Sequence, residues 1–101
     1  MKYEKLVRDK IPEMLDSKNI PYEKRIADDL EYKEALISKL GEEIQEFLAD
    51  KNVEELADIL EVVDALKKLP EFSDVLLVQA QKREKRGGFE KRIIAKGDDG
   101  K

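Results

Sequence analysis

The sequence predicts a mainly all-α protein, a helical bundle that is completed by oligomerisation. Three stretches with helical periodicity, about 30–50, 53–69 and 71–86, occupy most of the 101 residues. Hydrophobic residues form 41% of the chain and charged residues 44%, which suits one core beneath a strongly ionised surface. The apolar side chains of the second stretch cover about half of its circumference, more than one neighbouring helix can bury. We therefore expect one domain over residues 1–101, with a frayed tail at 97–101.

The other elements have local signals. A short helix is expected over about 9–18, with Asp9 at the N-cap and Pro12 in the first turn. The third long helix has Pro70 at its start and Gly87-Gly88 at its end, the usual order of these two residue types.

Two similar segments, YEKRIA (Tyr22–Ala27) and FEKRIIA (Phe89–Ala95), alternate in polarity after a breaker. Two short strands that pair with each other are the economical interpretation, and a chance likeness is the alternative.

Acidic residues interrupt the apolar faces of two helices. On a helical wheel with Val53 at zero, Glu55 falls at about 200° inside an apolar arc of roughly 160° to 340°, and Asp58 falls on its border at about 140°. On the preceding helix, Glu43 lies at the edge of the apolar stripe and Glu46 lies one turn further on. A buried carboxylate needs a cation, a hydrogen-bond network or a raised pKa.

A tight turn at 50–51 would place these acids at one level of a helical hairpin. In antiparallel register Glu46 then faces Glu55, and Glu43 faces Asp58. Carboxylates this close repel one another unless a divalent cation neutralises them. The chain has no histidine, so the oxygen ligands favour Mg²⁺ or Mn²⁺. The alternative is that these acids only stabilise a helix start or belong to solvated faces.

Composition excludes several classes of site and partner. With no cysteine and no histidine, disulfides, thiolate or imidazole zinc sites and Ser-His-Asp triads are ruled out. The net charge of -4 argues against nucleic acid as a partner. The charged amino terminus and the lack of a long apolar run indicate a cytoplasmic protein that neither enters a membrane nor is exported.

Charge is also uneven along the chain. Residues 31–74 carry 13 acids and 5 bases, whereas 82–96 carry 7 bases and 2 acids. An acidic centre with a basic tail suits a metal-bound phosphate, although ordinary variation in a charged helical protein explains the same counts.

Four segments together resemble the MazG-like, all-α nucleoside triphosphate pyrophosphohydrolases and their phosphoribosyl-ATP pyrophosphohydrolase relatives. KLGEEIQEF and EELADIL look like the EExxE and ExxD motifs of that family, and KLVRDKIP and KREKRGGF resemble the flanks of its small members. The resemblance covers residues 5–96. It implies a Mg²⁺-dependent enzyme that cleaves a nucleoside triphosphate between the α and β phosphates, as in the removal of noncanonical nucleotides.

The resemblance also implies roles for individual residues. The metal ligands would be Glu43, Glu46, Glu55 and Asp58, the same acids that the wheel and hairpin select. Glu42 and Glu43 are the catalytic candidates, with Glu42 orienting or deprotonating water. Only eight residues separate Glu46 from Glu55, fewer than in the best-known members, so the helices turn sooner and leave a shorter wall for a base or ribose.

The leaving pyrophosphate needs cations, and the basic segment of the third helix offers them. Lys82 and Arg86 lie one turn apart. The complete set of phosphate-binding candidates is Lys82, Arg83, Arg86, Gly87, Gly88, Arg8 and Lys10. The alternative for the helix-end cations is stabilisation of the helix dipole.

Two other functions remain open at the level of sequence. One is a non-catalytic helical oligomer that acts as a regulator or adaptor. The other is phosphoribosyl-ATP pyrophosphohydrolase of histidine biosynthesis. A homodimer or higher homo-oligomer is expected in each case.

Overall fold

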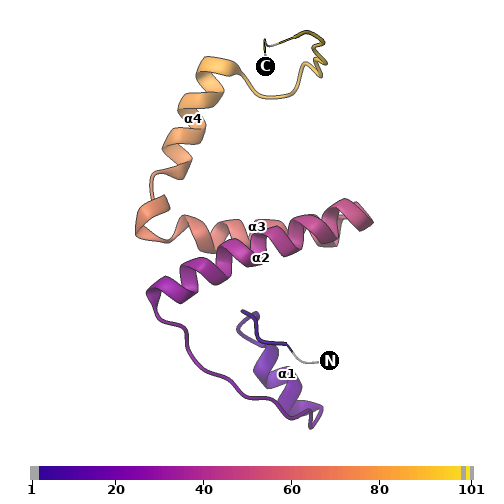
Figure 1. The fold of residues 1–101 in the computed structure, drawn as a ribbon, viewed down its shortest axis with the longest axis vertical. Helices are drawn as coiled ribbons and strands as arrows, with labels where there is room; N and C mark the ends of the chain where they lie inside the picture. The colour runs from indigo at the N-terminus through magenta and orange to yellow at the C-terminus, as the bar shows by residue number, and fades with distance from the viewer. Residues whose placement is uncertain (1–2, 99, 101) are drawn as a thin grey trace.

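The computed structural model describes residues 3–98 and 100. Its elements are α1 (Ile11–Ser17), α2 (Asp29–Asp50), α3 (Val53–Lys67), the short 3-10 helix η1 (Pro70–Phe72) and α4 (Val75–Arg86). The prediction of an all-α fold is confirmed. In Figure 1, α2 and α3 form an antiparallel hairpin across the middle of the molecule, with α1 on one side and α4 on the other.

The hairpin forms because both helix starts and the turn between them have suitable residues. The Asp28 side chain accepts a hydrogen bond from the Glu31 N–H (2.9 Å), and the Asn52 side chain accepts one from the Glu55 N–H (3.0 Å). Between the helices, Lys51 adopts the left-handed conformation (φ 51°) and ends α2. The turn therefore lies at 51–52, one residue later than the sequence predicts.

The short elements differ from expectation at their ends. α1 begins at Ile11 with Lys10 in the N-cap position, and no side chain caps it, so the prediction of Asp9 as N-cap is wrong. Asp9 instead lies within the turn that the Ile11 N–H closes on the Arg8 carbonyl (3.0 Å). The stretch 71–86 is not one helix, because the Ser73 hydroxyl bonds back to the Pro70 carbonyl (3.0 Å) and ends η1 before α4 begins.

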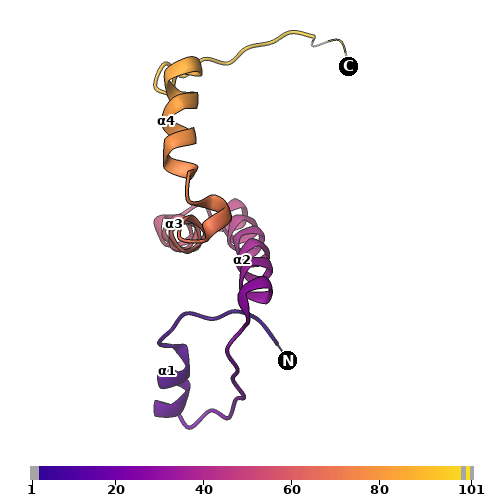
Figure 2. The ribbon, with the colours of Figure 1, turned by 90° about the vertical axis from the view of Figure 1, so that its left-hand side faces the viewer.

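The paired strands expected at 22–27 and 89–95 do not form, and neither segment is a strand in the part of the chain that the structure describes. Figures 1 and 2 show the reason: the segment before α2 and the segment after α4 lie toward opposite ends of the molecule. Most of their large apolar side chains are therefore exposed to solvent. Ile26 is 93% exposed and Ile94 is 94% exposed.

The chain is elongated, and its core is confined to the hairpin. Its radius of gyration is 18.2 Å, whereas a compact domain of this length has about 13 Å. Among the described residues the buried hydrophobic side chains are Leu36 and Val62. At the far end of the hairpin, Lys33 holds η1 by an ion pair to Glu71 (3.6 Å) and by lying over the Phe72 ring. The hairpin is thus the frame that positions the acidic residues.

None of the helices within the described residues combines the length and the apolar character that crossing a membrane requires.

Candidate metal centre

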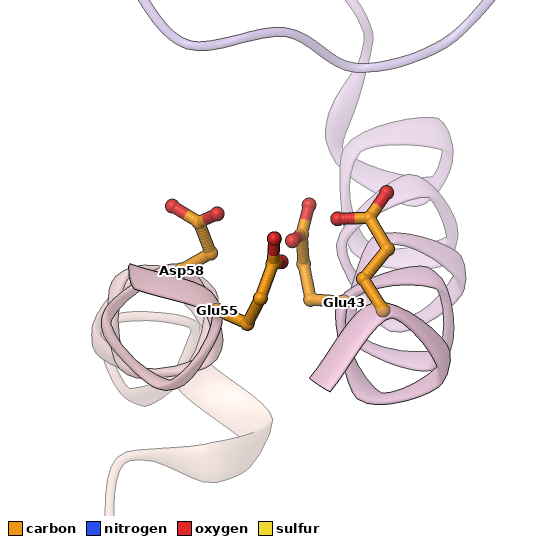
Figure 3. Close-up of side chains that lie close together, drawn as sticks. Glu43, Glu55 and Asp58 are labelled. Atoms are coloured by element: carbon orange, nitrogen blue, oxygen red, sulfur yellow. The ribbon is translucent and has the colours of Figure 1, made fainter. Parts of the chain in front are cut away.

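Four carboxylates from the two arms of the hairpin meet at one place. Glu43 and Glu46 come from α2, and Glu55 and Asp58 come from α3. One oxygen atom of each lies within 4.8 Å of the others. Figure 3 shows the labelled side chains of Glu43, Glu55 and Asp58 with their carboxylates on the same side of the hairpin. The predicted alignment of these acids is confirmed; their role as metal ligands stays a prediction.

The convergence follows from helix spacing. Each helix contributes two acids three residues apart, and residues at this spacing share a face. The early turn at Lys51 and Asn52 sets the antiparallel register that brings the two pairs to the same height. We call these four residues the acidic cluster.

Two oxygen atoms in the acidic cluster lack the partners that burial demands. Glu43 is only 6% exposed, and its Oε2 has no hydrogen-bond donor; Glu55 Oε2 is likewise buried without one. A buried carboxylate oxygen without a partner is costly. Oxygens on opposite sides of a Mg²⁺ ion lie about 4.2 Å apart, so the observed spread suits a hard cation after small side-chain movements. The donor set consists only of carboxylate oxygens, which fits Mg²⁺ or Mn²⁺.

The environment of Glu43 disfavours its charged form. Burial raises the pKa of Glu43 above its ordinary value, and the carboxylates of Glu46 and Asp58 raise it further. Lys39 lies one turn earlier on α2, and its Nζ is 3.5 Å from Glu43 Oε1. The positive charge of Lys39 lowers the pKa of Glu43 and so partly offsets these effects. The acidic cluster therefore holds more negative charge than its neighbouring cations offset.

Cations from the amino-terminal segment approach the acidic cluster from its open side. Arg8 Nη2 donates to Asp58 Oδ1 at 2.6 Å, and Lys5 Nζ donates to Glu42 Oε1 at 3.2 Å. The same Glu42 Oε1 atom also lies 3.7 Å from Lys39 Nζ. Its hydrogen bond to Lys5, supported by the charge of Lys39, lowers the pKa of the Glu42 carboxyl. Glu42 thus belongs to an ion-pair group beside the acidic cluster, and its role toward water stays a prediction.

The other phosphate-binding candidates lie elsewhere within a single chain. Lys82, Arg83 and Arg86 are on α4, and Gly87 and Gly88 follow it. Figure 1 shows α4 pointing away from the hairpin, from the end of α3 opposite the 50–52 turn. Arg83 forms an ion pair with Glu90 there.

Lys10 is at the start of α1, and among the described residues it forms no ion pair with the acidic cluster. In the part of the chain that the structure describes, Arg8 is the one predicted phosphate cation that contacts the acidic cluster.

Two cations at this site were not predicted from the sequence. Lys39 had a detectable signal, because it precedes Glu42 and Glu43 by three and four residues on the same helix. Lys5 had none, because 37 residues separate it from Glu42 and only the fold brings them together.

Comparisons with models of protein families, with curated proteins and with solved structures find no match to this chain.

Proposed function

We propose that this chain is a Mg²⁺-dependent nucleoside triphosphate pyrophosphohydrolase that yields a nucleoside monophosphate and pyrophosphate. The observation that carries the proposal is the acidic cluster, in which two buried carboxylate oxygens lack partners. The resemblance of the EExxE-like and ExxD-like segments to the MazG-like family supports the same activity. We infer a cytoplasmic enzyme that acts on free nucleotides, noncanonical ones included.

The roles of the residues follow from their chemistry. When bound, Mg²⁺ neutralises phosphate charge and makes water a better nucleophile. Glu43, Glu46, Glu55 and Asp58 would hold it through oxygen atoms. Glu43 is the buried member of this set, and Arg8 lies where it can donate hydrogen bonds to a phosphate oxygen.

The experiment is a pyrophosphate-release assay over a panel of nucleoside triphosphates and phosphoribosyl-ATP, with and without Mg²⁺. The proposal predicts metal-dependent release of pyrophosphate and monophosphate in equal amounts. Release of inorganic phosphate alone, or no turnover of any substrate while Mg²⁺ still raises the melting temperature, would contradict it. Preference for phosphoribosyl-ATP would assign the chain to the histidine-pathway reaction.

A second candidate is a non-catalytic, metal-stabilised helical oligomer. The observation that favours it is the distance between the acidic cluster and the basic end of α4 within one chain. This candidate predicts a metal-dependent rise in melting temperature without hydrolysis of any nucleotide in the panel.

A further inference from the structure

The segment 3–10 crosses the open side of the acidic cluster and is held at several points. Figure 3 shows the faint indigo amino-terminal chain passing over the carboxylates. We call residues 3–10 the strap. Lys5 ties it to α2 through Glu42 (3.2 Å), and Arg8 ties it to α3 through Asp58 (2.6 Å). The strap thus bridges both arms of the hairpin.

A third ion pair, at the beginning of the strap, does not involve the acidic cluster. Arg25 Nη2 donates to Glu4 (3.0 Å) and to Glu31 of α2 (2.7 Å). Departure of Arg8 from Asp58 breaks one of these exposed ion pairs and leaves the contacts of Glu4 and Lys5 in place, because those contacts do not involve the acidic cluster.

The contact of Arg8 with Asp58 is suited to exchange. The side chain of Arg8 is 55% exposed and that of Asp58 is 39% exposed. Water screens a pair of this kind, so the pair is weak. Asp58 is also one of the four carboxylates that would hold a divalent cation, and a guanidinium bound to it repels such a cation.

A displaced guanidinium would still lie beside the cation's ligands. Arginine presents several N–H donors in a plane, which match two oxygens of one phosphate group. Arg8 is the only cation of the strap that pairs with a member of the acidic cluster among the described residues. An anion bound to a cation held there would therefore lie close to Arg8.

Resting on the function proposed above, we propose that Arg8 exchanges partners. It occupies Asp58 when no divalent cation is bound, gives way when the cation binds, and then donates hydrogen bonds to a phosphate group of the anionic ligand. Arg8 is in this view both a counter-ion that weakens cation binding to the empty cluster and a specificity residue for polyphosphate.

The test measures two affinities with the full chain and variants Arg8→Gln and Arg8→Lys. Lys18→Gln is the matched control, because Lys18 is an exposed cation at the end of α1. The first affinity is that for Mn²⁺ alone, followed by the electron paramagnetic resonance of unbound Mn²⁺. The second is that of the Mn²⁺-saturated protein for inorganic pyrophosphate, followed by calorimetry.

The expected results have opposite signs. Arg8→Gln should bind Mn²⁺ on the order of tenfold more tightly, since it removes a like charge close to the cation. It should bind pyrophosphate at least about tenfold more weakly, since charge-assisted hydrogen bonds are lost. Arg8→Lys should keep the Mn²⁺ affinity of the wild type and lose part of the pyrophosphate affinity, and Lys18→Gln should match the wild type in both.

Several outcomes would overturn the proposal. Unchanged or weaker Mn²⁺ binding by Arg8→Gln would mean that Arg8 only positions Asp58 or has no role in cation binding. The proposed function would still stand in that case, provided that the wild type binds Mn²⁺. Tighter Mn²⁺ binding with unchanged pyrophosphate affinity would remove the role toward phosphate. A wild type that takes up no Mn²⁺ would refute the proposed function itself.

Discussion

Glu43 determines the electrostatic character of the acidic cluster. It is nearly buried, its Oε2 has no donor, and two other carboxylates lie beside it. Ionised Glu43 is therefore a cost to the folded chain until a cation compensates it. Replacement of a single acid in the acidic cluster should therefore change the melting temperature as well as the activity.

Replacement of Glu55 by Gln tests the ligand role of one acid. Without metal, we expect an unchanged or higher melting temperature, because one of several crowded charges is removed. With Mg²⁺, the rise in melting temperature and the turnover should both be lost. Glu61→Gln, an exposed acid on the polar side of the same helix, is the control and should behave like the wild type. Unfolding of Glu55→Gln, or normal turnover, would refute the ligand role.

The pH dependence of stability tests the raised pKa of Glu43. In the folded chain this pKa lies above the ordinary value of 4.5. The folded state therefore holds the proton more firmly than the unfolded state, and the stability contributed by protonated Glu43 is lost as the pH rises from 4.5 through the folded-state pKa. Without metal, the melting temperature of Glu43→Gln should exceed that of the wild type by a margin that grows over this range. A margin independent of pH would show that Glu43 is not perturbed.

At the scale of elements, the α2–α3 turn sets the register of the acidic cluster. Asn52→Ala removes the cap of α3 and should lower the free energy of unfolding by about 0.5–2 kcal/mol, measured by urea denaturation. Asp50→Ala is the control; it removes an acid from the last turn of α2, where the helix dipole disfavours it, and should be neutral or slightly stabilising. Equal losses in both variants would show that the cap does not hold the turn.

α4 exposes apolar side chains that no other described part of the single chain buries. Its apolar residues Val75, Leu76, Leu77 and Val78 are 41–60% exposed. An isolated helix of 12 residues is marginally stable in water, so we expect α4 to pack against a partner surface. A second chain is the partner we expect.

Arg86→Ala tests whether the basic end of α4 serves the substrate. Within one chain Arg86 lies away from the acidic cluster, so this role requires that α4 of a second chain reaches the cluster. In that arrangement we expect kcat/KM to fall about ten- to a hundredfold with little change in melting temperature, because charge-assisted hydrogen bonds to phosphate would be lost. Lys96→Ala, ten residues after the end of α4, is the control and should retain activity. A variant that melts slightly earlier but keeps its kcat/KM would assign Arg86 to the helix dipole instead.

At the scale of the whole molecule, an apolar stripe runs unburied along the hairpin. On α2 it consists of Leu30, Ile37, Ile44 and Leu48. The first three are about two helical turns apart, and Leu48 follows Ile44 by about one turn. Val53, Leu56 and Leu60 of α3 are exposed as well. Large unburied apolar surfaces of this kind are typical of chains that associate.

The stripe predicts a homo-oligomer, which light scattering at micromolar concentration would detect as a mass of at least twice 11.7 kDa. Ile37→Glu should dissociate it, because a charge in the centre of the interface is costly to bury. Ile26→Glu, at an exposed position before α2, should leave the mass unchanged. A wild-type mass equal to that of one chain would refute the expected association.

The local pattern of the sequence determined the hairpin and the alignment of its acids. The three-residue spacing placed Glu43 and Glu46 on one face of α2. The same spacing placed Glu55 and Asp58 on one face of α3, and the polar turn between the helices fixed their register. Such features depend on residues within a few turns of one another, so periodicity and capping predict them.

The tertiary structure alone decided what approaches the acidic cluster. Lys5 and Arg8 reach Glu42 and Asp58 across 37 and 50 residues, and α4 carries its cations away from the hairpin. The segments 22–27 and 89–95 resemble each other but lie too far apart to pair. Contacts of this kind depend on the directions in which the chain leaves each helix, which are set by packing and by the loss of chain entropy on closing long loops, and no local pattern encodes them.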